Sequence, residues 1–321
     1  MKYIATFVVL LFSINFLYPN NIYDKKYDII LDTDANNELD DQHAIAYMLF
    51  NQKFFNILGI TVNETFGGNK LKYHVLEAQR IVDLCGYNNK IRVIPGASKN
   101  YESIKNKITR KKFDGHKAVD FIIEKANQVE NEKLIIVAIG KLTNVALALE
   151  KDPEIAKKIK LIWLGSNFPK KGEYNLINDP GSLKPIIQNR NLEFEIVTVR
   201  YGEKTGSDYV KVNVDEIKEF MNNFKRKIKV PIEGRHGGEF YSFGQYSLNL
   251  FINYGFKERP LFDLCALSII KNPSFAEKKV IEKVDFDGTN WNFNGLKNRK
   301  IVFWENFNKE LILEDFFNSF D

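Results

Sequence analysis

The chain has 321 residues, of which 44% are hydrophobic and 13% aromatic, enough for one large core or two small ones. Its 46 basic and 41 acidic residues give a net charge of +5, and the lysines are scattered along the sequence. Scattered lysines indicate a solvated surface. The absence of a basic stripe with interleaved aromatic residues argues against nucleic acid as a partner.

Residues 1–20 form an apolar segment that begins with the positive charge of Lys2. The run from Tyr3 to Tyr18 is shorter than the roughly 20 residues of a transmembrane helix and matches a signal-peptide core. We therefore expect a signal peptide that exports the protein to the periplasm or the medium, and no membrane span in the mature chain. An uncleaved N-terminal anchor is the alternative, because no small-x-small cleavage site follows.

Strand-like and helix-like segments alternate from residue 27 onward. The expected strands cover residues 27–31, 57–62, 92–94, 134–139, 161–164 and 194–199. The expected helices cover residues 43–50, 70–84, 118–128, 143–150, a segment from near Pro180, 214–224, 242–254 and 263–270. This alternation predicts one α/β domain over residues 27–321, with a mostly parallel, Rossmann-like central sheet flanked by helices.

The C-terminal part changes character. Short strands are expected over residues 280–286, 290–294 and 300–304, and a last helix over 311–317. The sequence Asp287-Gly288-Thr289 is typical of a hairpin turn. We therefore predict a β-rich C-terminal extension over about residues 278–308.

The chain has two cysteines, Cys85 and Cys265, each within an apolar helical segment. This context favours buried free thiols, and a single disulfide is the alternative. The spacing of cysteines and histidines does not suggest a zinc site.

Five carboxylates crowd into ten positions directly after the first expected strand. They are Asp32, Asp34, Glu38, Asp40 and Asp41, and no lysine or arginine lies among them. Because like charges at this density repel, a hard divalent cation is the natural partner. Ligands of parallel α/β sheets bind beyond the carboxyl ends of the strands, where this run is expected. Capping of the next helix would explain one or two of the carboxylates but not all five.

Three further segments fit one site with the acidic run. The first is Gly140-Lys141-Leu142-Thr143-Asn144, the second Glu173-Tyr174-Asn175 with Asp179-Pro180 downstream, and the third Asp263. With these four pieces in order, the sequence resembles the inosine/uridine-preferring nucleoside hydrolase family, with Tyr174 in place of a phenylalanine. The resemblance covers about residues 27–267.

The resemblance implies a Ca²⁺ site and a role for each residue. The metal ligands would be the carboxylates of Asp34, Asp41 and Asp263 and the backbone carbonyl of Thr143, and Asp34 would also be the catalytic base that deprotonates a water held by the metal. The substrate-binding residues would be Asp40, Glu173 and Asn175 at the ribose hydroxyls, Asn63 or Asn69 at the ribose, Phe262 along the base, and His236, Arg235 or Tyr241 at the base. Asp32 would not bind the metal itself but would help to orient the residues that do.

The function implied is calcium-dependent hydrolysis of the N-glycosidic bond of ribonucleosides to ribose and free base, by a homo-oligomer. The physical chemistry is consistent, since Ca²⁺ takes roughly 6–8 oxygen ligands. Carboxylates also stabilise the positive charge that spreads over the sugar in an oxocarbenium-like transition state.

Two departures from the family pattern leave alternatives open. Asp40 and Asp41 follow Asp34 at a spacing two residues longer than in the family, with Ala35–Glu38 replacing a Pro-Gly turn. Phe262 stands where many members have a histidine that protonates the leaving base. A catalytically altered member that binds a ribosyl ligand through calcium is therefore one alternative. An aspartyl-nucleophile phosphatase that uses Asp32 is the other.

Overall fold

The computed structural model describes residues 26–320. The expected signal peptide or anchor at residues 1–20 lies outside the described residues. Within the described part, no helix is long and apolar enough to cross a bilayer.

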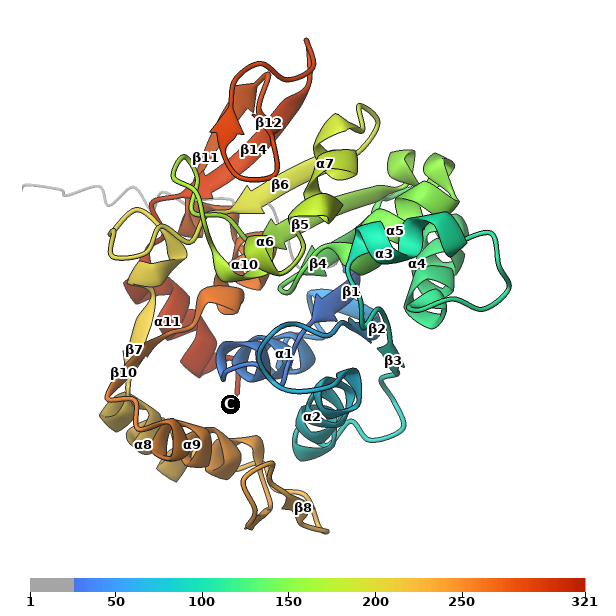
Figure 1. Ribbon diagram of the computed structural model, residues 1–321. Coiled ribbons are helices and arrows are strands. Elements are labelled where there is room, and N and C mark those ends of the chain that lie inside the picture. Colours follow the sequence, from blue (N-terminus) through green and yellow to red (C-terminus); the bar gives the residue numbers. More distant parts are fainter. Residues whose placement is uncertain (1–25, 321) are drawn as a thin grey trace, which may run out of the picture.

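An eight-stranded sheet forms the centre of the molecule (Figure 1). Its strand order is β11-β14-β6-β5-β4-β1-β2-β3, and all neighbours are parallel except β11 and β14. The strands are β1 (Tyr27–Thr33), β2 (Phe55–Val62), β3 (Val93–Pro95), β4 (Leu134–Ala138), β5 (Ile159–Leu164), β6 (Glu193–Val197), β11 (Glu277–Glu282) and β14 (Lys300–Glu305). The predicted mostly parallel α/β fold is confirmed.

The helices cover both faces of the sheet. They are α1 (Asp40–Phe50), α2 (Leu71–Leu84), α3 (Tyr101–Ile104), α4 (His116–Gln128), α5 (Thr143–Lys151), α6 (Tyr174–Asn178), α7 (Pro180–Gln188), α8 (Val214–Asn223), α9 (Phe243–Tyr254), α10 (Phe262–Lys271) and α11 (Lys309–Asn318). Alternate side chains of β1 enter two cores, with Ile29 and Leu31 in one and Ile30 in the other. This explains the continuous apolar runs of the central strands, which are buried on both faces.

A smaller lobe built from α8, α9 and short strands projects from the sheet (Figure 1). Its antiparallel pairs are β7 (Lys211–Asn213) with β10 (Glu258–Pro260), and β8 (Ile232–Glu233) with β9 (Glu239–Phe240). The β8–β9 hairpin contains the Gly-rich segment that carries His236. These short strands were not expected from the sequence, because pairs of two or three residues leave little periodicity.

The tail is divided differently from the expected pattern. The strand expected over residues 280–286 is broken into β11 and β12 (Asp285–Phe286), because Lys283 adopts a left-handed backbone with φ of 58°. β12 pairs with β13 (Trp291–Asn292) as the predicted hairpin. β11 and β14 join the central sheet beside β6. The two cysteines are buried free thiols, as predicted.

Candidate functional site

A pocket of about 170 Å³ lies at the carboxyl ends of the central strands. Asp34 follows β1, and loops after β4, β5 and β6 supply other walls, while α1 and α10 supply their first turns. The lining residues are Asp34, Asn37, Glu38, Asp40, Asp41, Ile139, Leu164, Glu173, Tyr174, Asn175, Val199, Tyr201, Arg259, Phe262 and Asp263. The parallel sheet thus brings the acidic run together with the later motifs.

Three carboxylates converge in this pocket. Asp40 and Asp41 lie in the first turn of α1, and Asp263 lies in the first turn of α10, which packs against α1. One oxygen from each lies within 4.8 Å of the others, and all three residues are buried. The N-cap of α1 is Leu39, without a side-chain capping bond, so helix capping does not account for these carboxylates. A buried set of hard oxygen donors fits a divalent cation such as Ca²⁺.

The electrostatics of the pocket reflect this crowding. Burial raises the pKa of Asp41 and of Asp263 well above the usual value, and the neighbouring carboxylates raise both further. Burial likewise raises the pKa of Asp40 to about 7 and that of Glu173 to about 7. A bound cation would offset the repulsion between the carboxylates and would lower their pKa values, because its positive charge stabilises the ionised forms.

Asp34 lies beside the three converging carboxylates. Its Oδ2 accepts a 2.5 Å hydrogen bond from the Thr65 hydroxyl, and its backbone carbonyl lies 2.7 Å from Nδ1 of His74. Burial raises its pKa, while the charge of His74 and the Thr65 bond lower it. The carboxylate of Asp34 is therefore oriented by the Thr65 hydrogen bond, and Asp34 lines the pocket. Thr65 was not singled out from the sequence, since a lone threonine after a strand carries no signal.

The longer acidic loop is fixed by residues from distant parts of the chain. Nε2 of Gln42 donates to the carbonyls of Ala35 at 2.7 Å and Glu38 at 3.0 Å. From the smaller lobe, the Tyr254 hydroxyl donates to the Asn37 carbonyl at 3.1 Å, and Arg235 donates to the Glu38 carbonyl. The turn that replaces the Pro-Gly of the family pattern is thus held by tertiary contacts.

Asp32 is fully buried and is not among the residues that line the pocket. Its carboxylate accepts hydrogen bonds from Thr61 at 2.6 Å, Asn144 at 2.7 Å and Asn63 at 3.1 Å. Asn144 also accepts from the Ala97 amide at 2.8 Å, so one buried network joins the ends of β1, β2, β3 and β4. The predicted supporting position of Asp32 is consistent with this geometry. Asn63 lies in this network, with Oδ1 buried and without a hydrogen-bond partner among the described residues.

The Glu173-Tyr174-Asn175 segment forms the start of α6. The Glu173 carboxylate accepts from the amides of Asn175 and Leu176, both at 2.9 Å. Nδ2 of the Asn175 side chain donates to the carbonyls of Ile139 at 3.1 Å and Leu164 at 3.0 Å, which fixes this side chain to the ends of β4 and β5. Both side chains line the pocket, where the ribose contacts predicted for them stay predictions.

The remaining predicted residues lie in three different places. Phe262 lines the pocket next to Asp263, and its ring meets that of Tyr201 edge to face at 6.0 Å. Thr143 begins α5, and its hydroxyl donates to Asp179 at 2.5 Å. His236 is exposed in the β8–β9 hairpin, 5.9 Å from the ring of Tyr254, and does not line the pocket.

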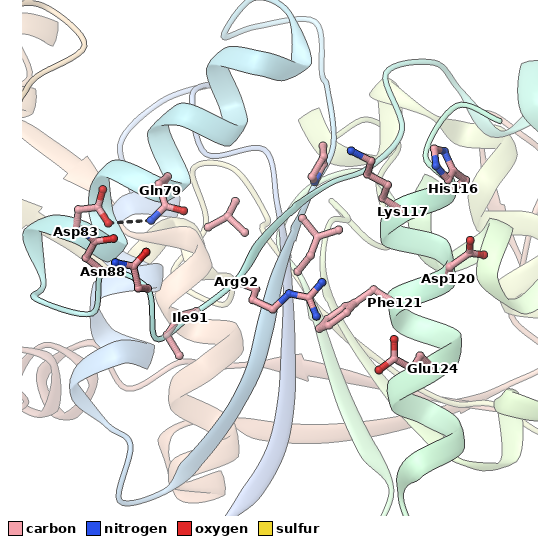
Figure 2. Close-up of a pocket in the computed structure, with 14 residues that line it drawn as sticks. Gln79, Asp83, Asn88, Ile91, Arg92, His116, Lys117, Asp120, Phe121 and Glu124 are labelled. Atoms are coloured by element: carbon pink, nitrogen blue, oxygen red, sulfur yellow. Dashed lines mark hydrogen bonds between the residues drawn. The ribbon is translucent and has the colours of Figure 1, made fainter. Parts of the chain in front are cut away.

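A larger cavity of about 670 Å³ lies at the sheet edge beside β3 (Figure 2). Asp83 on α2 and Asp120 on α4 face it from opposite walls, with Arg92 between them. Asp83 accepts from Gln79 at 2.8 Å, and Asp120 pairs with Lys151 at 2.6 Å. Asp83 and Asp120 lie on opposite walls and each has a partner, so the convergent carboxylate pocket is the better candidate site.

The fold and the acidic pocket together define a parallel α/β protein with a carboxylate-rich site at the carboxyl ends of its strands. A sequence model described as inosine-uridine preferring nucleoside hydrolase matches residues 29–303, and the chain belongs to this family of hydrolases that act on N-glycosyl compounds. The family is metal-dependent in general, in keeping with the acidic cluster. The family membership predicted from the four motifs is confirmed.

Two curated relatives illustrate the similarity. The chain is 28% identical to uridine nucleosidase 1 of Arabidopsis thaliana over 187 residues, which cover 50% of this chain and 53% of that protein. It is 29% identical to a probable uridine nucleosidase 1 of Oryza sativa subsp. japonica over 177 residues, which cover 47% of this chain and 52% of that protein. The match thus spans about half the length of these relatives.

Solved structures show the same fold over nearly the whole chain. A plant nucleoside hydrolase superposes with a TM-score of 0.69 at 19% identity, covering 92% of this chain and 99% of that one. An inosine-uridine preferring nucleoside hydrolase from Bacillus anthracis superposes with a TM-score of 0.67 at 18% identity, with the same coverage of both chains.

Proposed function

We propose that this protein is a calcium-dependent ribonucleoside hydrolase that splits a nucleoside into ribose and free base. The observation that carries the proposal is the convergence of Asp40, Asp41 and Asp263, with Asp34 beside them, in one buried pocket. The family match and the nucleosidase names of the relatives support the same activity.

The proposed roles are those that the family resemblance implies for these residues. A bound calcium ion would supply positive charge that anchors ribose hydroxyls and makes water easier to deprotonate. The calcium ligands would be the carboxylates of Asp34, Asp41 and Asp263 and the Thr143 carbonyl. Asp34 would also accept the proton of the attacking water. Asp34 suits this second role because its carboxylate is oriented by Thr65.

The sugar would lie against the polar wall of the pocket. We propose that Asp40, Glu173 and Asn175 hydrogen-bond its hydroxyls. The carboxylates of Asp40 and Glu173 would also stabilise the positive charge of the oxocarbenium-like transition state. Burial strengthens this effect, because water screens it less.

The direct test is ribose release from a panel of nucleosides, with calcium and with a chelator. We expect activity that is lost on chelation and restored by added calcium. Asp34→Asn should lower turnover by about 10²–10⁴-fold, as expected for loss of a general base. Asp215→Asn, an exposed change on α8, is the matched control. Turnover that persists in chelator or in Asp34→Asn contradicts the mechanism.

Phe262 favours a second candidate, a family member that binds a ribosyl ligand through calcium without cleaving it. The same panel distinguishes the two, because this candidate predicts calcium-dependent binding heats without ribose release. Asp32 as the nucleophile of a phosphatase is disfavoured, because three hydrogen bonds hold its carboxylate outside the pocket lining.

A further inference from the structure

Among the described residues that line the acidic pocket, Arg259 is the one with a positive charge. It lies on β10, just before α10. Its guanidinium carbon is 5.2 Å from the ring centroid of Phe262 and 5.2 Å from that of Phe256. The cation therefore rests on the aromatic side chain that replaces the expected histidine.

Arg259 is held in place by the longer acidic loop. The Glu38 carboxylate forms an ion pair with its guanidinium, and 18% of the arginine side chain is exposed. Glu38 belongs to the turn whose extra length distinguishes this chain from the family pattern, and the Gln42 and Arg235 bonds fix the Glu38 carbonyl. The loop and the cation therefore form one structural unit.

The guanidinium retains unused donor capacity. Its Nε is buried and has no hydrogen-bond partner among the described residues. An unsatisfied buried N–H is costly, and an acceptor atom of a ligand bound in the pocket would satisfy it. Burial lowers the pKa of Arg259 to about 10, and the side chain therefore stays protonated near neutral pH.

We propose that Arg259 binds the departing base and stabilises the negative charge that the base acquires as the N-glycosidic bond breaks. This inference rests on the proposed nucleosidase function. With the ribose against the carboxylates, the base would extend toward the end of the pocket formed by Tyr201, Phe262 and Arg259. Glu38 is the positioning residue that holds the guanidinium there.

The proposed reaction needs no general acid in the protein. The water oxygen forms a bond to the anomeric carbon, and Asp34 takes the proton of that water. The electron pair of the broken carbon–nitrogen bond goes to the base, which leaves as an anion hydrogen-bonded to the guanidinium. The base then takes a proton from solvent, and Asp34 returns its proton to solvent. The two departures from the family pattern thus compensate each other: Phe262 removes a proton donor, and the longer loop supplies the anchor for a cation.

The test compares a nucleoside with a substrate whose leaving group needs no stabilisation by the protein. We would measure kcat/KM for uridine and for p-nitrophenyl riboside, whose leaving group is already a stable anion. Arg259→Ala should lower kcat/KM for uridine by about 10²–10³-fold, as for loss of an oxyanion donor, and change that for p-nitrophenyl riboside by less than about threefold. Arg259→Lys should fall between, because it keeps the charge but not the planar fork.

Glu38→Gln tests the positioning role and should lower the uridine rate selectively by about tenfold, since a displaced guanidinium stabilises the anion less well. Arg110→Ala, at an exposed loop position, is the matched control and should change neither rate. Calcium binding by calorimetry shows for each variant whether the pocket is folded. If Arg259→Ala does not fold, Arg259→Lys and Glu38→Gln carry the same comparison.

The outcomes separate the inference from the proposed function. Selective loss of uridine cleavage supports the role of Arg259. Equal loss with both substrates, or no loss with either, in variants that still bind calcium overturns it. A wild-type protein that cleaves neither substrate overturns the proposed nucleosidase function, and the role of Arg259 falls with it.

Discussion

Arg235 donates a hydrogen bond from Nη1 to Oδ1 of Asn36 at 3.3 Å, joining the β8–β9 hairpin to the acidic loop. Its Nη2 donates to the Glu38 carbonyl and, at 2.8 Å, to the Tyr254 hydroxyl. The loop between Asp34 and Asp40 is therefore held from the smaller lobe. Since the same loop sets the spacing of Asp34 and Asp41, the lobe helps to position the carboxylates of the pocket.

Replacing Arg235 by alanine should weaken calcium binding. Loss of residues that orient metal ligands typically costs about 10–100-fold in affinity, and we expect a loss in this range. Calorimetric titration with calcium measures it, and Arg110→Ala controls for the loss of one surface charge. Unchanged calcium affinity in a folded Arg235→Ala protein would show that the loop keeps its conformation without the hydrogen bonds of Arg235.

The stability of the metal-free protein should fall as pH rises from about 4 to 7. Burial raises the pKa of Asp40 and of Glu173 to about 7, whereas unfolded carboxylates titrate near 4. In this window the folded protein binds more protons than the unfolded chain, so stability is present at low pH and is lost as pH passes the folded pKa.

Saturating calcium should reverse this trend, because the metal binds ionised carboxylates and its binding releases protons. Urea unfolding at several pH values between about 4 and 7, with chelator and with calcium, measures both slopes. A metal-free protein that gains stability across this window would contradict the proposed protonation of the pocket.

Asn144→Ala should destabilise the fold by about 1–3 kcal/mol. The Asn144 side chain donates to Asp32 at 2.7 Å and accepts from the Ala97 amide at 2.8 Å. Alanine removes one of the three hydrogen bonds to the buried Asp32 carboxylate and the side-chain acceptor of the Ala97 amide. Urea unfolding measures the loss. Asn253→Ala, on the exposed side of α9, should stay within about 0.5 kcal/mol of the wild type. Equal stability of the two variants would show that the hydrogen bonds of Asn144 contribute little to the stability of the fold.

Gly140→Ala should lower turnover more than stability. A Cβ at this position would lie 3.1 Å from Oδ1 of Asp34 and 3.0 Å from Nδ2 of Asn63, so the carboxylate of Asp34, the proposed base, would have to move slightly. We expect a loss of about 10–100-fold in kcat for a displacement below 1 Å.

Gly181→Ala is the matched control, because its nearest neighbour is the flexible side chain of Glu102, which can move away. Steady-state assays with one nucleoside compare the two variants. Similar kcat values for both would show that Asp34 tolerates the contact.

The sequence predicted most of the elements, because their signals are local. The apolar run of β4 and the amphipathic pattern of α4 lie within a few residues of their predicted bounds. The break at Lys283 left no comparable signal, since lysine carries no local preference for the left-handed backbone that it adopts here. Its carbonyl accepts a 2.7 Å hydrogen bond from the amide of Gly295, twelve residues further along the chain.

By itself the sequence determined the α/β class, the family and the carboxylates that meet in the pocket, because strand ends in a parallel sheet share one edge and the motifs follow those ends. Only the tertiary structure decided how the longer loop is held and what lies against Phe262. Arg235, Thr65 and Arg259 reach their partners from distant segments, and such contacts depend on packing between elements rather than on periodicity within one. The pairing of Glu38 with Arg259 belongs to this second kind, because neither residue lies in a motif that predicts the other.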